Sequence, residues 1–188
     1  MADVDRIRRL EGTVFFLCFA GSIPLSNWLI GNVGTTCLPD GPCLIPVAPG
    51  LEAPSGVLTV GLALTLRDLV QRRLGLNWSI VAIALGAFLS ATFAPSALVV
   101  ASTVAFLLSE FADLAVYTPL QRRRFIRAVI LSSVVGLIVD SMVFLWLAFG
   151  SLDFLAGQVV GKSWMVLAAL PVLAWLRSRD RRLGIQPA

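Results

Sequence analysis

The sequence predicts an all-α polytopic membrane protein with six transmembrane helices, and three observations lead to that prediction. Apolar residues make up 57% of the 188 residues, charged residues only 14%, and the mean hydropathy is +0.87, well outside the range of soluble globular proteins. Six apolar stretches each have roughly the length that crosses about 30 Å of hydrocarbon. When these stretches alternate in direction, nearly all basic residues fall on one side.

The predicted spans follow one another closely along the chain. They cover residues 12–32, 54–70, 78–93, 97–117, 128–149 and 158–176. Spans and short connectors fill the chain, so we predict a single integral membrane domain over residues 1–188 and no soluble catalytic domain. The first span follows three arginines but lacks a clear small-residue cleavage site, so we interpret it as a retained span rather than a signal peptide.

The basic residues set the expected orientation. All of them except Lys162 fall on the side of the two termini, and Arg67 lies one turn inside that face. By the positive-inside rule, both termini are expected in the cytoplasm, with the chain as a multi-pass protein of the inner (plasma) membrane. The net charge of +4 then reflects topology and contact with the anionic lipid bilayer, so we predict no nucleic-acid partner.

The longest connector, residues 33–53, is rich in Pro and Gly and contains no Lys or Arg. Its prolines exclude a helix, and the apolar run Leu44-Ile45-Pro46-Val47 favours a lid that packs on the bundle over a disordered loop. Cys37 and Cys43 flank a Pro-Asp-Gly-Pro turn, and an oxidising compartment would permit a disulfide between them. Two reduced thiols are the alternative, and without any histidine a metal site is not predicted.

Carboxylates inside the predicted spans are the strongest indication of function, because each ionisable group costs roughly 2.5–3.5 kcal/mol to insert. Glu110 and Asp113 share one helical face. The same face carries Phe106 and Tyr117, and Asp140 lies near the midpoint of the next span. We expect no basic residue at the depth of Glu110 and Asp140, so these groups must be protonated, hydrogen-bonded or available to a ligand.

Other polar groups have structural alternatives to a functional role. Arg67 and Asp68 lie near the interface on the termini side, where they could snorkel or cap a helix. Asp113 could pair with the arginines at 122–124. These alternatives stay open at the level of sequence.

The same holds on the opposite side. Lys162, one turn after Gln158, could reach the outer headgroups or Asp153. Asn27 could form a hydrogen bond between helices, a common use of buried amides in membranes.

Aromatic residues fit a flat ligand. Five of them could face one cavity, although tryptophans also collect at membrane interfaces: Trp28, Phe106, Tyr117, Phe144 and Trp164. A carboxylate can accept two parallel N–H bonds while an aromatic ring stacks on a planar heterocycle. Guanine-like bases present such a donor pair, and other polar planar molecules would satisfy the same chemistry.

Missing motifs argue against catalysis. The chain contains no histidine and therefore no imidazole general base, and it lacks a Walker A pattern for ATP. The serines in the spans have no base partner at a suggestive spacing. We therefore predict no enzymatic activity, no catalytic residue and no cofactor.

Two motifs resemble a known family. The stretch Ala105-Phe-Leu-Leu-Ser-Glu-Phe-Ala-Asp-Leu-Ala-Val-Tyr117 resembles the fourth-span motif of the VUT, or queuosine precursor transporter, family. Gly136-Leu-Ile-Val-Asp-Ser-Met-Val-Phe144 resembles its fifth-span motif. Shorter matches agree in order along the chain, namely Ser26-Asn27-Trp28-Leu29, Arg67-Asp68 with Gly75, and Lys162 before Pro171. The chain departs from the family pattern at Leu137, where Asn is common, and at Glu110, where some members have Gln.

This resemblance implies uptake of queuosine precursors, which are 7-deazaguanine derivatives such as the 7-cyano base. It also implies a six-helix fold similar to the substrate-binding subunits of energy-coupling vitamin transporters. Carried over position by position, its candidate residues are Asn27, Asp68, Glu110, Asp113, Asp140 and Lys162.

We therefore predict an inner-membrane importer whose substrate is a modified purine-like base. The predicted substrate-binding residues are Asn27, Phe106, Glu110, Asp113, Asp140 and Lys162, with Trp28, Asp68, Tyr117, Phe144 and Gln158 as a secondary group. Proton coupling and facilitated diffusion both stay open, and a homodimer is compatible with so small a bundle.

Two other classes remain as alternatives. The chain could be a binding subunit for a separate ATP-driven module, for which Gly12, Ala20 and Gly21 offer a thin docking stripe. It could also be an intramembrane enzyme or an assembly factor. Copurification with an ATPase, or turnover in detergent without a gradient, would distinguish these alternatives from a transporter.

Overall fold

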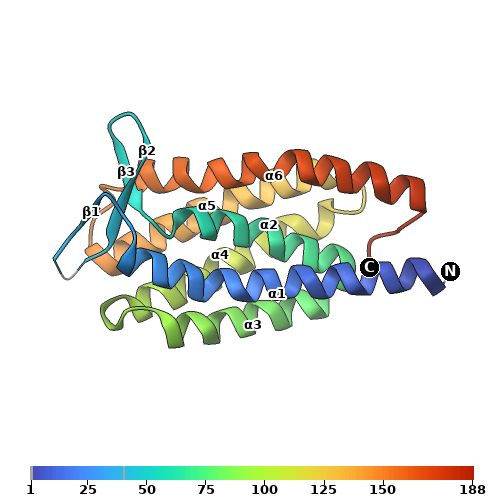
Figure 1. Ribbon diagram of the computed structural model, residues 1–188, viewed down its shortest axis with the longest axis horizontal. Helices are drawn as coiled ribbons and strands as arrows, with labels where there is room; N and C mark the ends of the chain where they lie inside the picture. The colour runs from blue at the N-terminus through green and yellow to red at the C-terminus, as the bar shows by residue number, and fades with distance from the viewer. Residues whose placement is uncertain (1, 40) are drawn as a thin grey trace.

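Six long helices and a small three-stranded sheet make up the computed structural model, which describes residues 2–39 and 41–188 (Figure 1). The helices are α1 (Ala2–Asn32), α2 (Val57–Leu74), α3 (Leu76–Phe93), α4 (Val99–Leu120), α5 (Phe125–Phe149) and α6 (Leu155–Leu183). A turn of 3-10 helix, Ser96–Leu98, precedes α4. Each predicted span overlaps one helix, but the predicted starts of the second and fourth spans lie outside it, because residues 54–56 form a strand end and a turn and residues 97–98 are 3-10 helix.

The helices run alongside one another in alternating directions (Figure 1). The strands lie at one end of the bundle, which we call the sheet end, and both chain termini lie at the other, which we call the termini end. The α2–α3 and α4–α5 connections therefore lie at the termini end. The α3–α4 and α5–α6 connections lie at the sheet end.

Five of the six helices are long and apolar enough to cross a membrane, and α2 is the exception. Helix α2 carries four charged residues, Arg67, Asp68, Arg72 and Arg73, and all four are buried. All five other helices contact α2. A helix enclosed by protein needs no apolar outer surface, because its charged groups face the bundle interior rather than lipid.

The long connector between α1 and α2 forms an antiparallel sheet, which the sequence analysis did not predict. Its strands are β1 (Thr36–Cys37), β2 (Cys43–Ala48) and β3 (Leu51–Pro54), in the order β1-β2-β3. A disulfide joins Cys37 to Cys43. The sheet packs on α6, where the Trp164 indole donates a hydrogen bond to the Val47 carbonyl over 3.0 Å.

Candidate functional site

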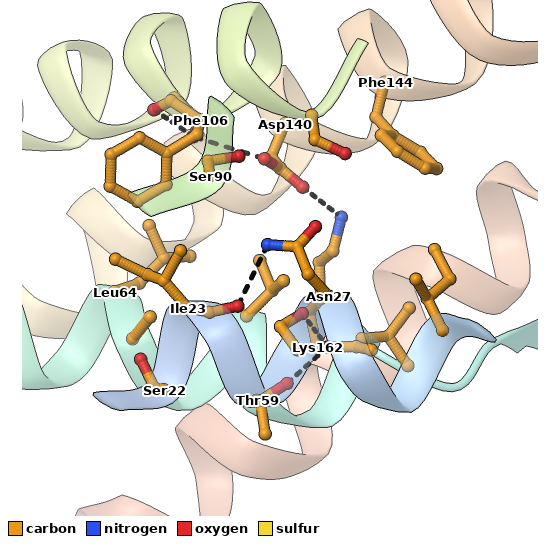
Figure 2. Close-up of a pocket in the computed structure, with 18 of the residues that line it drawn as sticks. Ser22, Ile23, Asn27, Thr59, Leu64, Ser90, Phe106, Asp140, Phe144 and Lys162 are labelled. Atoms are coloured by element: carbon orange, nitrogen blue, oxygen red, sulfur yellow. Dashed lines mark hydrogen bonds and ion pairs between the residues drawn. The ribbon is translucent and has the colours of Figure 1, made fainter. Parts of the chain in front are cut away.

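A cavity of about 80 Å³ lies inside the bundle, and all six helices contribute to its wall (Figure 2). The wall comes from the last third of α1 and the first turns of α2 and α6, so the cavity lies nearer the sheet end. Its polar residues are Ser22, Ser26, Asn27, Thr59, Ser90, Ser102, Ser109, Glu110, Asp140, Gln158 and Lys162.

Asp140 forms an ion pair with Lys162 across the cavity wall (Figure 2). The Lys162 Nζ atom lies 2.6 Å from Asp140 Oδ2, and it also donates to Ser141 Oγ at 2.7 Å and Gln158 Oε1 at 2.5 Å. These partners occupy all three donors of the ammonium group. Ser109 donates to the other Asp140 oxygen over 3.4 Å.

The expectation that Asp140 has no basic residue at its depth is therefore wrong. Asp140 lies nine residues from the sheet-end terminus of α5, and Lys162 lies seven residues from that of α6. At 1.5 Å rise per residue, the two differ in height by only about 3 Å. Lys162 is 1% exposed, so it reaches neither the outer headgroups nor Asp153.

A glycine on α2 explains how Lys162 comes so close to the interior. A Cβ atom at Gly61 would collide with the Lys162 carbonyl oxygen and lie 2.9 Å from its Cα. Only a residue without a side chain lets the backbones of α2 and α6 approach this closely. Gly61 thus positions the first turns of α6 against the cavity.

Glu110 also has a basic partner, which the sequence analysis did not predict. Arg67 donates from Nε to Glu110 Oε2 over 3.1 Å, and its Nη2 pairs with Asp113. Its Nη1 lies 3.0 Å from Asp68 Oδ1 and donates to Gln71 over 3.2 Å. We call the four charged residues the Arg67 cluster: Arg67, Asp68, Glu110 and Asp113.

The Arg67 cluster corrects two structural alternatives. Arg67 and Asp68 are both 0% exposed, so neither snorkels to the interface. Asp113 pairs with Arg67 of α2 rather than with the arginines at 122–124. Glu110 belongs both to this cluster and to the cavity wall.

The structure brings seven of the predicted substrate-binding residues together in the cavity wall. They are Asn27, Phe106, Glu110, Asp140, Phe144, Gln158 and Lys162. Phe106 and Phe144 flank Asp140 in Figure 2. The Asn27 amide donates to the Ile23 carbonyl of its own helix over 3.0 Å, rather than to another helix as the structural alternative proposed.

Other predicted residues lie elsewhere. Asp68, Asp113 and Tyr117 are buried but are not part of the cavity wall. Trp28 and Trp164 are 55% and 53% exposed, so they face outward. The expectation of five aromatic rings around one cavity is wrong, because three of those rings lie outside its wall.

The hydroxyl groups of the cavity wall were not predicted from the sequence. Ser22 and Ser26 are four residues apart on α1, and Ser102, Phe106 and Ser109 follow helical spacing on α4. Residues at these spacings share one helical face. A search for hydroxyls on the face that carries Phe106 would have found the α4 pair.

A second group of charges, three buried and two partly exposed, closes the termini end. Asp180 of α6 accepts hydrogen bonds from Arg72 at 2.9 Å and from Arg73 at 2.8 Å. Glu11 of α1 accepts from Arg73 at 2.8 Å and pairs with Arg179. We call these five residues the termini-end network. They tie α1, α2 and α6 together on the side away from the sheet.

A bundle of apolar helices around a largely apolar cavity with several polar groups in its wall defines a class, that of membrane proteins that handle a small solute. The comparisons show a similarity to one family over part of the chain. A family model described as "putative vitamin uptake transporter" matches residues 92–176. This match bears out the resemblance to the VUT family over that segment, which includes Glu110, Asp113, Asp140 and Lys162. No curated protein and no solved structure matched the chain in the corresponding searches.

Proposed function

We propose that this protein imports a queuosine precursor, a 7-deazaguanine derivative such as 7-cyano-7-deazaguanine, across the inner membrane. The internal cavity is the substrate site in this proposal, and the chain crosses the membrane six times with both termini in the cytoplasm. The match to a family of vitamin uptake transporters supports transport. The chemistry of the cavity wall supports a planar, donor-rich substrate.

The observation that carries the proposal is that only one of the two carboxylate oxygens of Glu110 has a partner. Arg67 binds Glu110 Oε2, and no hydrogen bond among the described residues reaches Oε1. Glu110 nevertheless lines the cavity, so its carboxylate can accept N–H bonds from a ligand. The ring N–H and amino groups of a deazaguanine are adjacent donors, which a carboxylate accepts well.

The other cavity residues suit the rest of such a base. Phe106 and Phe144 offer ring faces or edges on which a planar heterocycle can pack. Asn27 uses its amide nitrogen to bind Ile23, and no donor among the described residues reaches its carbonyl oxygen, which can therefore accept from a ligand. Asp140 is engaged by Lys162 and Ser109, so Glu110 is the better acceptor of the two carboxylates.

Two features of the sheet end support the proposed orientation. The sheet end carries a disulfide between Cys37 and Cys43, and disulfides persist in oxidising compartments outside the cytoplasm. Apart from Arg67 and Lys162, the basic residues lie toward the termini end, as the positive-inside rule expects of a cytoplasmic face.

The structure suits a state that is closed toward the cytoplasm. The Arg67 cluster and the termini-end network both lie between the cavity and the termini end. A substrate entering from the sheet end would therefore have to wait for these ion pairs to separate. Alternating access of this kind is the general mode of secondary transporters.

The experiment is uptake of labelled 7-cyano-7-deazaguanine by cells that cannot synthesise it and that express the wild-type chain or a variant. We expect uptake with the wild type and with Glu52→Gln, because the Glu52 side chain is exposed on β3. We expect Glu110→Gln to lose most of it. Equal uptake by wild type and Glu110→Gln would remove the proposed site.

The docking stripe for an ATP-driven module gains no support from the structure. Gly12 packs against Leu74 and Arg73 of α2, with a Cβ atom at this position 3.0 Å from Arg73 Cβ. Of the two glycines in the stripe, only Gly21 faces open space. Copurification of the tagged chain with an ATPase would contradict transport by the single chain.

A further inference from the structure

We propose that the Arg67 cluster is a proton-binding site and that Asp113 is the residue that holds the proton. This inference deepens the proposed function, because it names the ion that the transporter exchanges. The proton binds a carboxylate oxygen and leaves to water, and no other group is needed for the step. The evidence is a charge imbalance, an orphaned oxygen atom and the position of Glu110.

The charges of the cluster do not balance. One guanidinium group faces three carboxyl groups, and the side chains of all four residues are between 0% and 2% exposed. If every carboxyl group were ionised, two negative charges would lie uncompensated in the protein interior. Buried charges of this kind are neutralised by a proton rather than left unpaired.

The neighbouring cations compensate at most one of these two charges, because the termini-end network holds three arginines and two acidic residues, and the other charge needs a proton. Arg72 and Arg73 are held by Asp180, which lies in the termini-end network. Lys162 is held by Asp140. The Arg67 cluster is thus the buried ion cluster with an excess of acidic groups among the described residues.

The partners of the three carboxyl groups single out Asp113. Glu110 binds Arg67 through Oε2 and reaches the cavity. Asp68 accepts a hydrogen bond from Ser132 at Oδ2 over 3.1 Å, and its Oδ1 has no hydrogen bond among the described residues but lies 3.0 Å from the Arg67 guanidinium. Asp113 binds Arg67 through Oδ1, but its Oδ2 is buried and has neither a hydrogen bond nor an ion pair among the described residues.

The surroundings of Asp113 Oδ2 suit a neutral carboxylic acid. This atom faces α5 at Gly136, where an added Cβ would lie 3.3 Å from it. One turn earlier on α5, the hydroxyl of Ser133 is also buried without a partner in the described structure. A protonated carboxyl group is a donor and a serine oxygen can accept, so α5 offers a group of the right chemistry to such an acid.

The groups that face the cluster from the other helices do not compete for this role. Helix α5 presents the hydroxyls of Ser132 and Ser133, and α4 adds the Tyr117 ring over Arg67. Helix α3 contains no ionisable residue, and the charged residues of α1 lie within its first eleven positions. The charged residues of α6 are Lys162, paired with Asp140, and those at the termini end.

A proton fits the site better than a metal ion. The carboxyl groups converge on the Arg67 guanidinium, and no three His, Cys, Asp or Glu side chains within residues 2–39 and 41–188 are grouped to hold a metal. Glu110 connects the proton site to the cavity, because it binds Arg67 on one side and lines the cavity on the other. Substrate and proton occupancy are therefore linked through one side chain.

The test is infrared spectroscopy of the full chain in lipid nanodiscs at neutral pH. We expect the C=O stretching band of one protonated carboxylic acid, with an isotope shift in heavy water and loss of the band at high pH. In Asp113→Asn the band should disappear, while Asp153→Asn, an exposed residue of the α5–α6 loop, should keep it. A wild-type spectrum without the band would overturn the proposal whether or not the variant folds.

Further arms separate this inference from the proposed function. Addition of 7-cyano-7-deazaguanine should shift or remove the band in wild type, because the base binds at Glu110. A band that is present but unaffected by the base would leave the proton site standing and contradict the proposed substrate. Persistence of the full band in Asp113→Asn would contradict the assignment to Asp113.

Discussion

At the residue scale, the ion pair between Asp140 and Lys162 contributes little net stability to the contact between α5 and α6. Its Nζ–Oδ2 distance is 2.6 Å, but desolvation of both ions offsets much of their attraction, so a well-packed apolar pair would often be as stable. The pair lies in the wall of a cavity with several hydroxyl and amide groups. This setting favours a role in recognising a polar substrate over a role in stability.

A double-mutant cycle tests this interpretation. We expect Asp140→Asn to destabilise the protein by about 3–5 kcal/mol, because Lys162 would be left buried without its counter-ion. Lys162→Met together with Asp140→Asn should recover most of the loss in the thermal midpoint in detergent. Uptake of the precursor should stay low in both the single variant Asp140→Asn and the double variant. An unchanged midpoint for Asp140→Asn alone would mean that the two groups do not form an ion pair.

The sequence identified the ionisable residues of the site but not their partners. Glu110, Asp140 and Lys162 attract notice in any sequence, because charged groups in apolar spans are rare and costly. Which cation lies beside which carboxylate depends on the rotation and depth of neighbouring helices. A pattern within one helix carries no such information, so the pairing of Glu110 with Arg67 was missed.

At the scale of elements, α2 organises the molecule. It supplies Arg67 to one cluster and Arg72 and Arg73 to another, and it contacts every other helix. Its contact with α6 depends on Gly61, because a side chain at this position would strike the α6 backbone. The backbone of α6 cannot yield as a flexible side chain could.

We therefore expect Gly61→Ala to destabilise the protein by about 1–3 kcal/mol through overpacking. The same substitution should displace Lys162 and weaken binding of the precursor. Gly21→Ala is the matched control, because a Cβ atom there meets nothing within 4 Å, and it should leave midpoint and binding unchanged. Equal thermal midpoints for Gly61→Ala and Gly21→Ala would show that α2 and α6 are less closely packed than described.

Helices were easier to predict than the sheet. Each apolar run corresponds to a helix, although α6 continues to Leu183, beyond the apolar run, where its arginines can face water and headgroups. The strands between Thr36 and Pro54 are two to six residues long and contain prolines, so they lack the alternating pattern of a longer strand. Their pairing depends on the turns and on contact with α6.

At the scale of the whole molecule, the two ends differ in chemistry. The termini end carries most of the arginines, whereas the sheet end carries a disulfide and, in the loops it contains, no basic residue. A membrane with an anionic, reducing cytoplasmic side would orient such a molecule with its termini inward. In this orientation the sheet end, which is the end of the bundle nearer to the cavity, would face the outside of the cell.

Thiol labelling in intact cells tests the orientation. In a Cys18→Ala background, we expect a membrane-impermeant maleimide to label Cys37 and Cys43 only after reduction, without permeabilising the membrane. The matched control is Ser178→Cys in a chain whose three native cysteines have been removed; Ser178 is exposed near the end of α6. We expect this cysteine to be labelled only after the membrane is permeabilised. The reverse pattern would place the sheet end in the cytoplasm.

The most direct measurement is exchange of labelled for unlabelled 7-cyano-7-deazaguanine by the purified chain in proteoliposomes without any imposed gradient. The account predicts rapid exchange by wild type and Glu52→Gln, and at least a tenfold loss in Glu110→Gln, in line with the roughly 1.5–3 kcal/mol of a hydrogen bond to a charged group. Folded wild-type protein that exchanges no base, or a Glu110→Gln variant that exchanges it as fast as wild type, would contradict the account.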